Sequence, residues 1–164
     1  MYMKNVTTEI KWALIFIAMT LGWMILERLV GLHDENIDKH MIYTNFMAIP
    51  AIGVYVLALL EKRRKVFGGV MTYKQGFLSG LIITAIVTVF SPLTQIITSL
   101  VITPEFFSNA IAYAVEQGKS TREQAERYFS LTSYIVQGLI GAPVMGIVTT
   151  AIVAIFTVKK SKQV

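Results

Sequence analysis

Four long apolar stretches dominate the pattern of hydrophobic and polar positions along the chain. They run from about residue 12 to 32, 41 to 60, 76 to 102 and 131 to 158. A helix that rises 1.5 Å per residue needs about 20 apolar residues to cross about 30 Å of hydrocarbon. Each stretch is long enough for that, so the sequence predicts an all-α integral membrane four-helix bundle, with residues 1–164 as one membrane domain.

Composition also indicates a membrane protein. Hydrophobic residues make up 54% of the chain and charged residues 15%, whereas soluble domains carry about 25% charged residues. Mean hydropathy is +0.60 and the isoelectric point is near 9.5. The basic residues cluster at the ends of the apolar stretches rather than along one face, so we expect the lipid bilayer, and no nucleic acid, as their partner. The absence of Cys excludes disulfides and a Cys nucleophile.

A basic run between the second and third stretches predicts the orientation. It consists of Lys62, Arg63, Arg64 and Lys65, and short basic loops stay in the cytoplasm. Placing this loop and both termini inside puts ten basic and two acidic residues on the inner face, against five basic and eight acidic residues on the outer face. We therefore expect cytoplasmic N- and C-termini, with the basic run acting only as an anchor to anionic lipid at the inner face.

The segment between the third and fourth stretches, residues 103–130, predicts an extracytoplasmic helical hairpin. Thr103 and Pro104 are typical of an N-cap and first helical position, and Gly118 is typical of a helix stop. Ser120 and Glu123 have the spacing of a capping box, which starts a second helix. That second helix can continue without a break into the fourth stretch.

Polar side chains from all four stretches fall at similar depths in the outer third of the bilayer, counted at about 1.5 Å per residue. This polar layer consists of Glu27, Arg28, Asn45, Ser91, Gln95 and Gln137. A charge inside a membrane is costly and therefore suggests function, although polar helix contacts and interfacial anchoring are the alternatives. We expect Glu27 to face the bundle and Arg28 to extend outward.

Small residues form stripes along the third and fourth stretches. The members expected in helix packing are Gly76, Gly80, Gly138, Ala142 and Gly146. Small residues let helix backbones approach closely, so these helices are expected to pack on each other or on a partner. A lined pathway for a solute is the alternative, and no charge lies in either stripe to support it.

The chain contains no recognisable catalytic motif. His33 and His40 flank an acidic link with Asp34, Glu35 and Asp38, but the spacing matches no metal template. We interpret this link as a solvated acidic loop without a metal. The signatures of zinc proteases, serine hydrolases, P-loop proteins and dinucleotide-binding proteins are absent. We therefore expect no catalytic residues, no enzyme activity and no cofactor.

Three segments carry a family resemblance. They are residues 71–80 (MTYKQGFLSG), residues 103–107 (TPEFF) before an acidic hairpin with a Gly turn, and residues 158–160 (VKK) at the end of the last stretch. Together they resemble the bacterial membrane-protein family "domain of unknown function 4199". The resemblance departs at Thr103, where that family more often has Asp. It implies four spans in the bacterial inner (cytoplasmic) membrane and assigns no activity.

Two functions fit these observations. The first is an accessory or interaction protein that binds a membrane-protein partner or a second copy of itself. The second is an oligomeric transport module for a small solute or ion that uses the polar layer. Four spans enclose little room, so the transport module requires oligomerisation.

Overall fold

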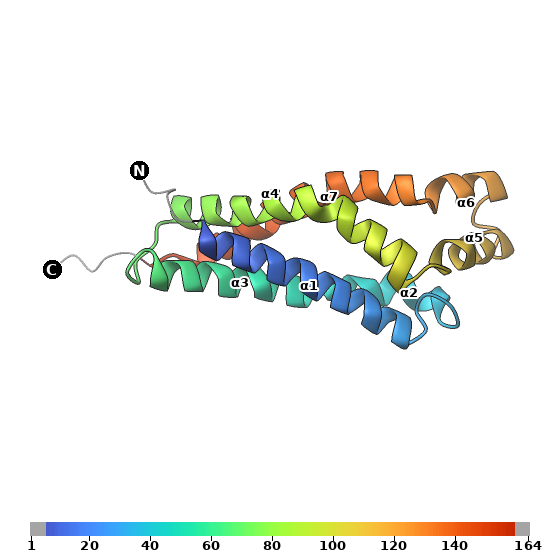
Figure 1. Cartoon of the computed structure of the whole chain (residues 1–164), viewed down its shortest axis with the longest axis horizontal. Helices are drawn as coiled ribbons and strands as arrows, with labels where there is room; N and C mark the ends of the chain where they lie inside the picture. Colours follow the sequence, from blue (N-terminus) through green and yellow to red (C-terminus); the bar gives the residue numbers. More distant parts are fainter. Residues whose placement is uncertain (1–5, 160–164) are drawn as a thin grey trace.

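The computed structural model describes residues 6–159, which form an elongated helical bundle (Figure 1). Its four long helices are α1 (Thr7–Leu29), α3 (Ala48–Lys65), α4 (Tyr73–Ile97) and α7 (Leu131–Thr157). The shorter elements are α2 (Ile37–Tyr43), the 3₁₀ turn η1 (Thr44–Met47), the π-helical turn η2 (Thr98–Ile102), α5 (Phe106–Glu116) and α6 (Arg122–Tyr128).

Within residues 6–159, four helical stretches are long and apolar enough to cross a membrane, as predicted. They are Thr7–Leu29, Ile37–Lys65, Tyr73–Ile102 and Leu131–Thr157. Large apolar side chains point outward from them; Val89 is 74% and Phe156 79% exposed. Such apolar faces suit lipid rather than water, and continuous helices satisfy their own backbone hydrogen bonds there. The chain is a multi-pass membrane protein.

The two ends of the bundle differ in structure (Figure 1). The terminal end holds the start of α1, the end of α7 and the loop between α3 and α4. At this end Met71 and Lys159 exchange two backbone hydrogen bonds of 3.0 Å. The hairpin end holds α2, α5, α6 and the turn of residues 30–36. α4 and α7 therefore run antiparallel.

Close contact between α4 and α7 accounts for the small residues of both helices. A Cβ atom added to Gly80 would lie 2.4 Å from Cγ2 of Thr150, and one added to Gly146 would lie 2.4 Å from Cγ2 of Thr84. Either distance is too short for any side chain. Further along the same faces, Gly76 lies against Ala154, and Gly138 lies against Ser91. Of the two packing modes expected from the stripes, the structure places these residues in the contact between the two helices.

The buried apolar core lies towards the terminal end. It draws on the start of α1 and α4 and on the end of α3 and α7, and includes Ala13, Tyr55, Ala58, Leu59, Ile83 and Val153. Tyr55 is buried beside Thr84, and their hydroxyl groups are 2.8 Å apart. This bond links α3 to the α4 face that packs on α7.

α4 changes direction along its length (Figure 1). Pro92 lies inside the helix and cannot donate a backbone hydrogen bond, which is a common cause of a bend. The helix then widens into η2, where the backbone N–H of Thr103 reaches back to the carbonyl of Thr98 at 2.8 Å. The carbonyl of Ile102, at the end of this turn, accepts a hydrogen bond from the Arg28 side chain of α1.

The helical pair at the hairpin end differs from the prediction in three details. α5 begins at Phe106 with Glu105 in the N-cap position, so Thr103 and Pro104 do not start the helix. The capping box uses Thr121 and Gln124 rather than Ser120 and Glu123, so α6 begins one residue later. α6 also ends before α7 begins. The Ser130 side chain accepts a hydrogen bond from the backbone N–H of Ser133, which starts a new helix at Leu131 instead of continuing the old one.

Candidate functional site at the hairpin end

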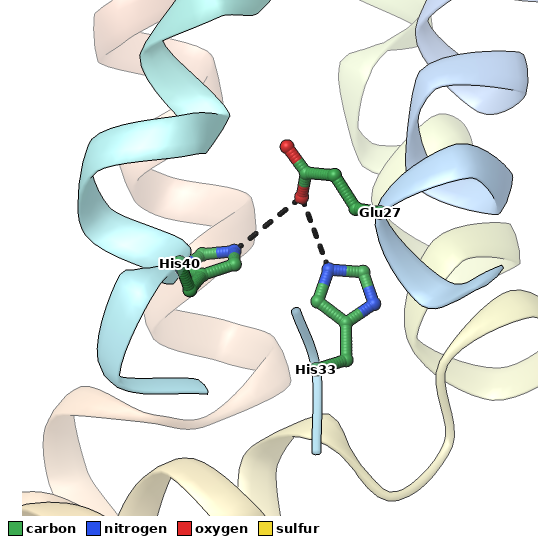
Figure 2. Close-up of side chains that lie close together, drawn as sticks. All are labelled: Glu27, His33 and His40. Atoms are coloured by element: carbon green, nitrogen blue, oxygen red, sulfur yellow. Dashed lines mark hydrogen bonds and ion pairs between the residues drawn. The ribbon is translucent and has the colours of Figure 1, made fainter. Parts of the chain in front are cut away.

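A buried carboxylate lies at the centre of the hairpin end. Glu27, near the end of α1, is only 2% exposed. Its Oε1 accepts a hydrogen bond from the indole N–H of Trp23, one helical turn earlier. Its Oε2 lies 3.1 Å from Nε2 of His33 and 3.5 Å from Nε2 of His40. Figure 2 shows both imidazole rings turned toward this one oxygen.

The turn after α1 brings the first histidine back to Glu27. Gly31 has φ +73°, a conformation that glycine adopts readily and that ends helices. The backbone N–H of Leu32 bonds to the carbonyl of Glu27 at 2.9 Å, and the Asn36 side chain bonds to the carbonyl of Val30 at 3.1 Å. These hydrogen bonds close the turn and so fix the position of His33, the residue that follows Leu32.

α5 packs directly on the two histidines. The ring of Phe106 lies 5.1 Å from that of His33 and 5.0 Å from that of His40, between ring centroids. The Asn109 side chain donates a hydrogen bond of 2.9 Å to the carbonyl of His33. The site is therefore built jointly by α1, the turn of residues 30–36, α2 and α5.

The arrangement contradicts the prediction of a solvated acidic loop for the two histidines. The side chains of His33 and His40 are 6% and 23% exposed, while Asp34, Glu35 and Asp38 point to the outside. One donor atom from each of Glu27, His33 and His40 lies within 4.8 Å of the others, which is close enough for a shared metal ion. Within residues 6–159, Nδ1 of His33 is buried without a hydrogen-bond partner.

Arg28 lies outside this cluster, although it follows Glu27 directly. Successive residues of a helix point in different directions. Arg28 is exposed, and its guanidinium donates a hydrogen bond of 2.5 Å to the carbonyl of Ile102. This bond ties α1 to the end of η2.

The other members of the predicted polar layer do not meet Glu27. The side chain of Asn45 bonds to the carbonyl of Met41. The side chains of Gln95 and Gln137 bond to Ser99 and Ser133 of their own helices. The prediction of one layer shared by all four spans is therefore wrong. Equal depth does not place residues on facing sides of their helices.

Two members of that layer line a cavity. Ser91 and Gln95 face a hollow of about 250 Å³ between α1, α4 and α7, and Gly138 and Ala142 form part of its wall. Most of the remaining lining is apolar, from residues such as Phe16. The hollow lies among the spans and is separate from the Glu27 cluster.

The terminal end carries a set of ion pairs that sequence reasoning missed. Glu9 and Lys62 are 1% and 4% exposed, and their charged atoms are 2.8 Å apart. Glu61 pairs with Lys11 and with Lys65. In the sequence, these residues served only to predict orientation. In the structure, Glu9–Lys62 and Lys11–Glu61 are ion pairs between α1 and α3.

These contacts correct the role predicted for the basic run. Lys62 is buried against Glu9, so its ammonium group does not reach lipid. Arg63 donates a hydrogen bond of 2.9 Å to the carbonyl of Thr157 in α7. Arg64 and Lys65 are exposed at the surface, where Lys65 pairs with Glu61. Half of the run therefore holds helices together.

Comparison with known proteins gives one family. The sequence profile described as "Protein of unknown function (DUF4199)" matches residues 11–159. That range includes the four long helices almost completely, together with both ends of the bundle and the Glu27 cluster. No curated protein and no solved structure gives a significant match.

Proposed function

The chain belongs to the family of proteins of unknown function DUF4199, and we propose that it is a non-enzymatic accessory protein that binds another membrane protein in the bacterial inner membrane. The distribution of basic residues supports cytoplasmic termini. The terminal end would then face the cytoplasm and the hairpin end the opposite side. We place the partner contact at the hairpin end.

An open groove between α5 and α6 carries this proposal. It has a volume of about 480 Å³, and its lining includes the apolar residues Ile111 and Val115 of α5 and the charged residues Glu116, Arg122 and Glu126. Arg122 pairs with Glu126 at 2.9 Å, so the lining presents both signs of charge beside apolar side chains. An apolar centre within a polar rim is typical of contacts between proteins.

The alternative contact surface is already used. Gly80 and Gly146, which the sequence offered for association with a partner, pack inside the chain between α4 and α7. The outward faces of the spans carry apolar side chains that suit lipid. The α5–α6 groove, in contrast, is exposed and offers both apolar and charged side chains, which specific recognition of a protein partner needs.

Site-specific photo-crosslinking in native membranes tests the proposal. A photoreactive residue at Val115 or Arg122 should give one discrete protein adduct, while the matched control at Phe156, on the exposed apolar face of α7, should give none. An adduct at twice the mass of the chain would identify the partner as a second copy. Identical adduct patterns at all three positions, or no protein adduct from the groove, would contradict the proposal.

The cavity beside Ser91 and Gln95 favours a second candidate function, transport of a small solute by an oligomer. Its volume of about 250 Å³ suits a small ligand, and it lies among the spans. A protein that stays strictly monomeric in detergent and gives no solute flux in proteoliposomes would remove this candidate.

A further inference from the structure

We propose that Glu27, His33 and His40 bind one divalent first-row transition metal ion, for which Zn²⁺ is the best match. The ion would hold α1, the turn of residues 30–36 and α2 in a fixed arrangement beneath α5. This site lies apart from the α5–α6 groove, so the inference does not depend on the proposed partner.

The donor set and its spacing fit zinc. Zn²⁺ commonly binds imidazole nitrogen and carboxylate oxygen at about 2.0–2.2 Å in a tetrahedron, which separates neighbouring donor atoms by about 3.3 Å. Oε2 of Glu27 lies 3.1 Å from Nε2 of His33 and 3.5 Å from Nε2 of His40. All three donors lie within 4.8 Å of one another. The fourth position is left for water.

Charge compensation gives an independent reason. A carboxylate buried inside a span needs a positive charge nearby. Within residues 6–159 the ion pairs of Glu27 are with His33 and His40, while Arg28 bonds to a backbone carbonyl instead. An imidazole carries positive charge only when it is protonated, whereas a divalent ion on Oε2 would supply that charge at any pH.

Neighbouring side chains orient and cover the three proposed ligands. The indole N–H of Trp23 holds Oε1 of Glu27, which orients the carboxylate so that Oε2 faces the rings. Phe106 covers the two imidazoles on the α5 side. His40 is partly exposed, so the cluster is not closed off from the surface.

The composition of the chain makes the test clean. His33 and His40 are its only histidines, and it has no Cys, so a stoichiometric Zn²⁺ site has no other imidazole or thiolate ligands to use. The full chain is purified in lipid nanodiscs with an affinity tag that lacks histidine. It is stripped with a chelator and titrated with Zn²⁺ in competition with a chromophoric chelator.

The parent chain should bind one Zn²⁺. His40→Gln should lower the Zn²⁺ affinity more than about a hundredfold, because loss of a residue that merely hydrogen-bonds to a metal ligand already lowers metal affinity about tenfold to a hundredfold. Co²⁺ should give the intense visible absorption of tetrahedral coordination in the parent and lose it in His40→Gln. The matched control Glu35→Gln/Asp38→Asn removes exposed carboxylates nearby and should leave the affinity unchanged.

His40 is the first choice for substitution because it is the less buried of the two histidines. Glu27→Gln is the second variant, and circular dichroism with size-exclusion chromatography verifies the fold of each. Absence of saturable Zn²⁺ binding by the parent, or equal affinity in a folded His40→Gln, would show a metal-free hydrogen-bonded cluster and overturn the inference. Either result leaves the crosslinking test of the groove unaffected, so the two proposals fail separately.

Discussion

Gly80 of α4 lies so close to Thr150 of α7 that a Cβ atom on Gly80 would be 2.4 Å from Cγ2 of that threonine. One turn away the relationship is reversed, with Gly146 of α7 against Thr84 of α4. Lipid gives helices little hydrophobic reason to associate, so close backbone approach of this kind contributes much of the packing free energy.

This contact predicts a clear difference between two glycines of α7. Gly146→Ala forces a methyl group into Thr84 and should lower the free energy of unfolding by about 1–3 kcal/mol. Gly141→Ala is the matched control, because nothing lies within 4 Å of the added Cβ. Unfolding by detergent titration measures both variants. Equal stabilities of the two variants would contradict the packing described here.

The buried pair at the terminal end predicts a second difference. Lys62→Met leaves the Glu9 carboxylate buried without its partner at 2.8 Å, and should lower the free energy of unfolding by about 3–5 kcal/mol. Lys65→Met is the control, because Lys65 is exposed and pairs with Glu61 at the surface. Its effect should stay within about 1 kcal/mol.

The same detergent titration measures this pair. The double variant Glu9→Gln/Lys62→Met should recover part of the lost stability, because no buried charge remains unpaired. A Lys62→Met variant as stable as Lys65→Met would show that the ion pair is not buried as the structure has it.

The start of α6 predicts a third difference, between neighbouring residues. Thr121→Ala removes the side chain that accepts from the backbone N–H of Gln124, and should destabilise the helix by about 1 kcal/mol. Ser120→Ala removes a hydroxyl that takes no part in the capping box and should have little effect. Hydrogen exchange of the α6 amides checks both, and faster exchange in Ser120→Ala alone would restore the capping box that the sequence pattern indicated.

The four spans were predictable because length and apolarity alone decide them. The capping box was misplaced by one residue because Ser120–Glu123 and Thr121–Gln124 both satisfy the pattern. Local sequence cannot choose between them. The choice depends on where the chain leaves Gly118, the positive-φ residue that follows α5.

The Glu27 cluster was only partly predictable. The cost of a charge inside a span marked Glu27 for attention, but its partners lie beyond the turn at Gly31. No periodic pattern continues through such a turn, so sequence spacing did not connect His33 with the carboxylate. Counting residues along each span also gave a wrong neighbour for Gln137. Such a count gives the height of a residue in the membrane but not the direction in which its side chain points.

The orientation of the two ends is the central claim of the proposed function, because it places the partner contact on the outer side of the membrane. Labelling of single cysteines tests it most directly. The natural chain has no Cys, so Gln117→Cys between α5 and α6 and Arg64→Cys at the end of α3 each provide one thiol at an exposed position. A membrane-impermeant maleimide should label Gln117→Cys in intact spheroplasts and Arg64→Cys only after the membrane is opened. Labelling of Arg64→Cys in intact spheroplasts, with Gln117→Cys protected, would contradict the account.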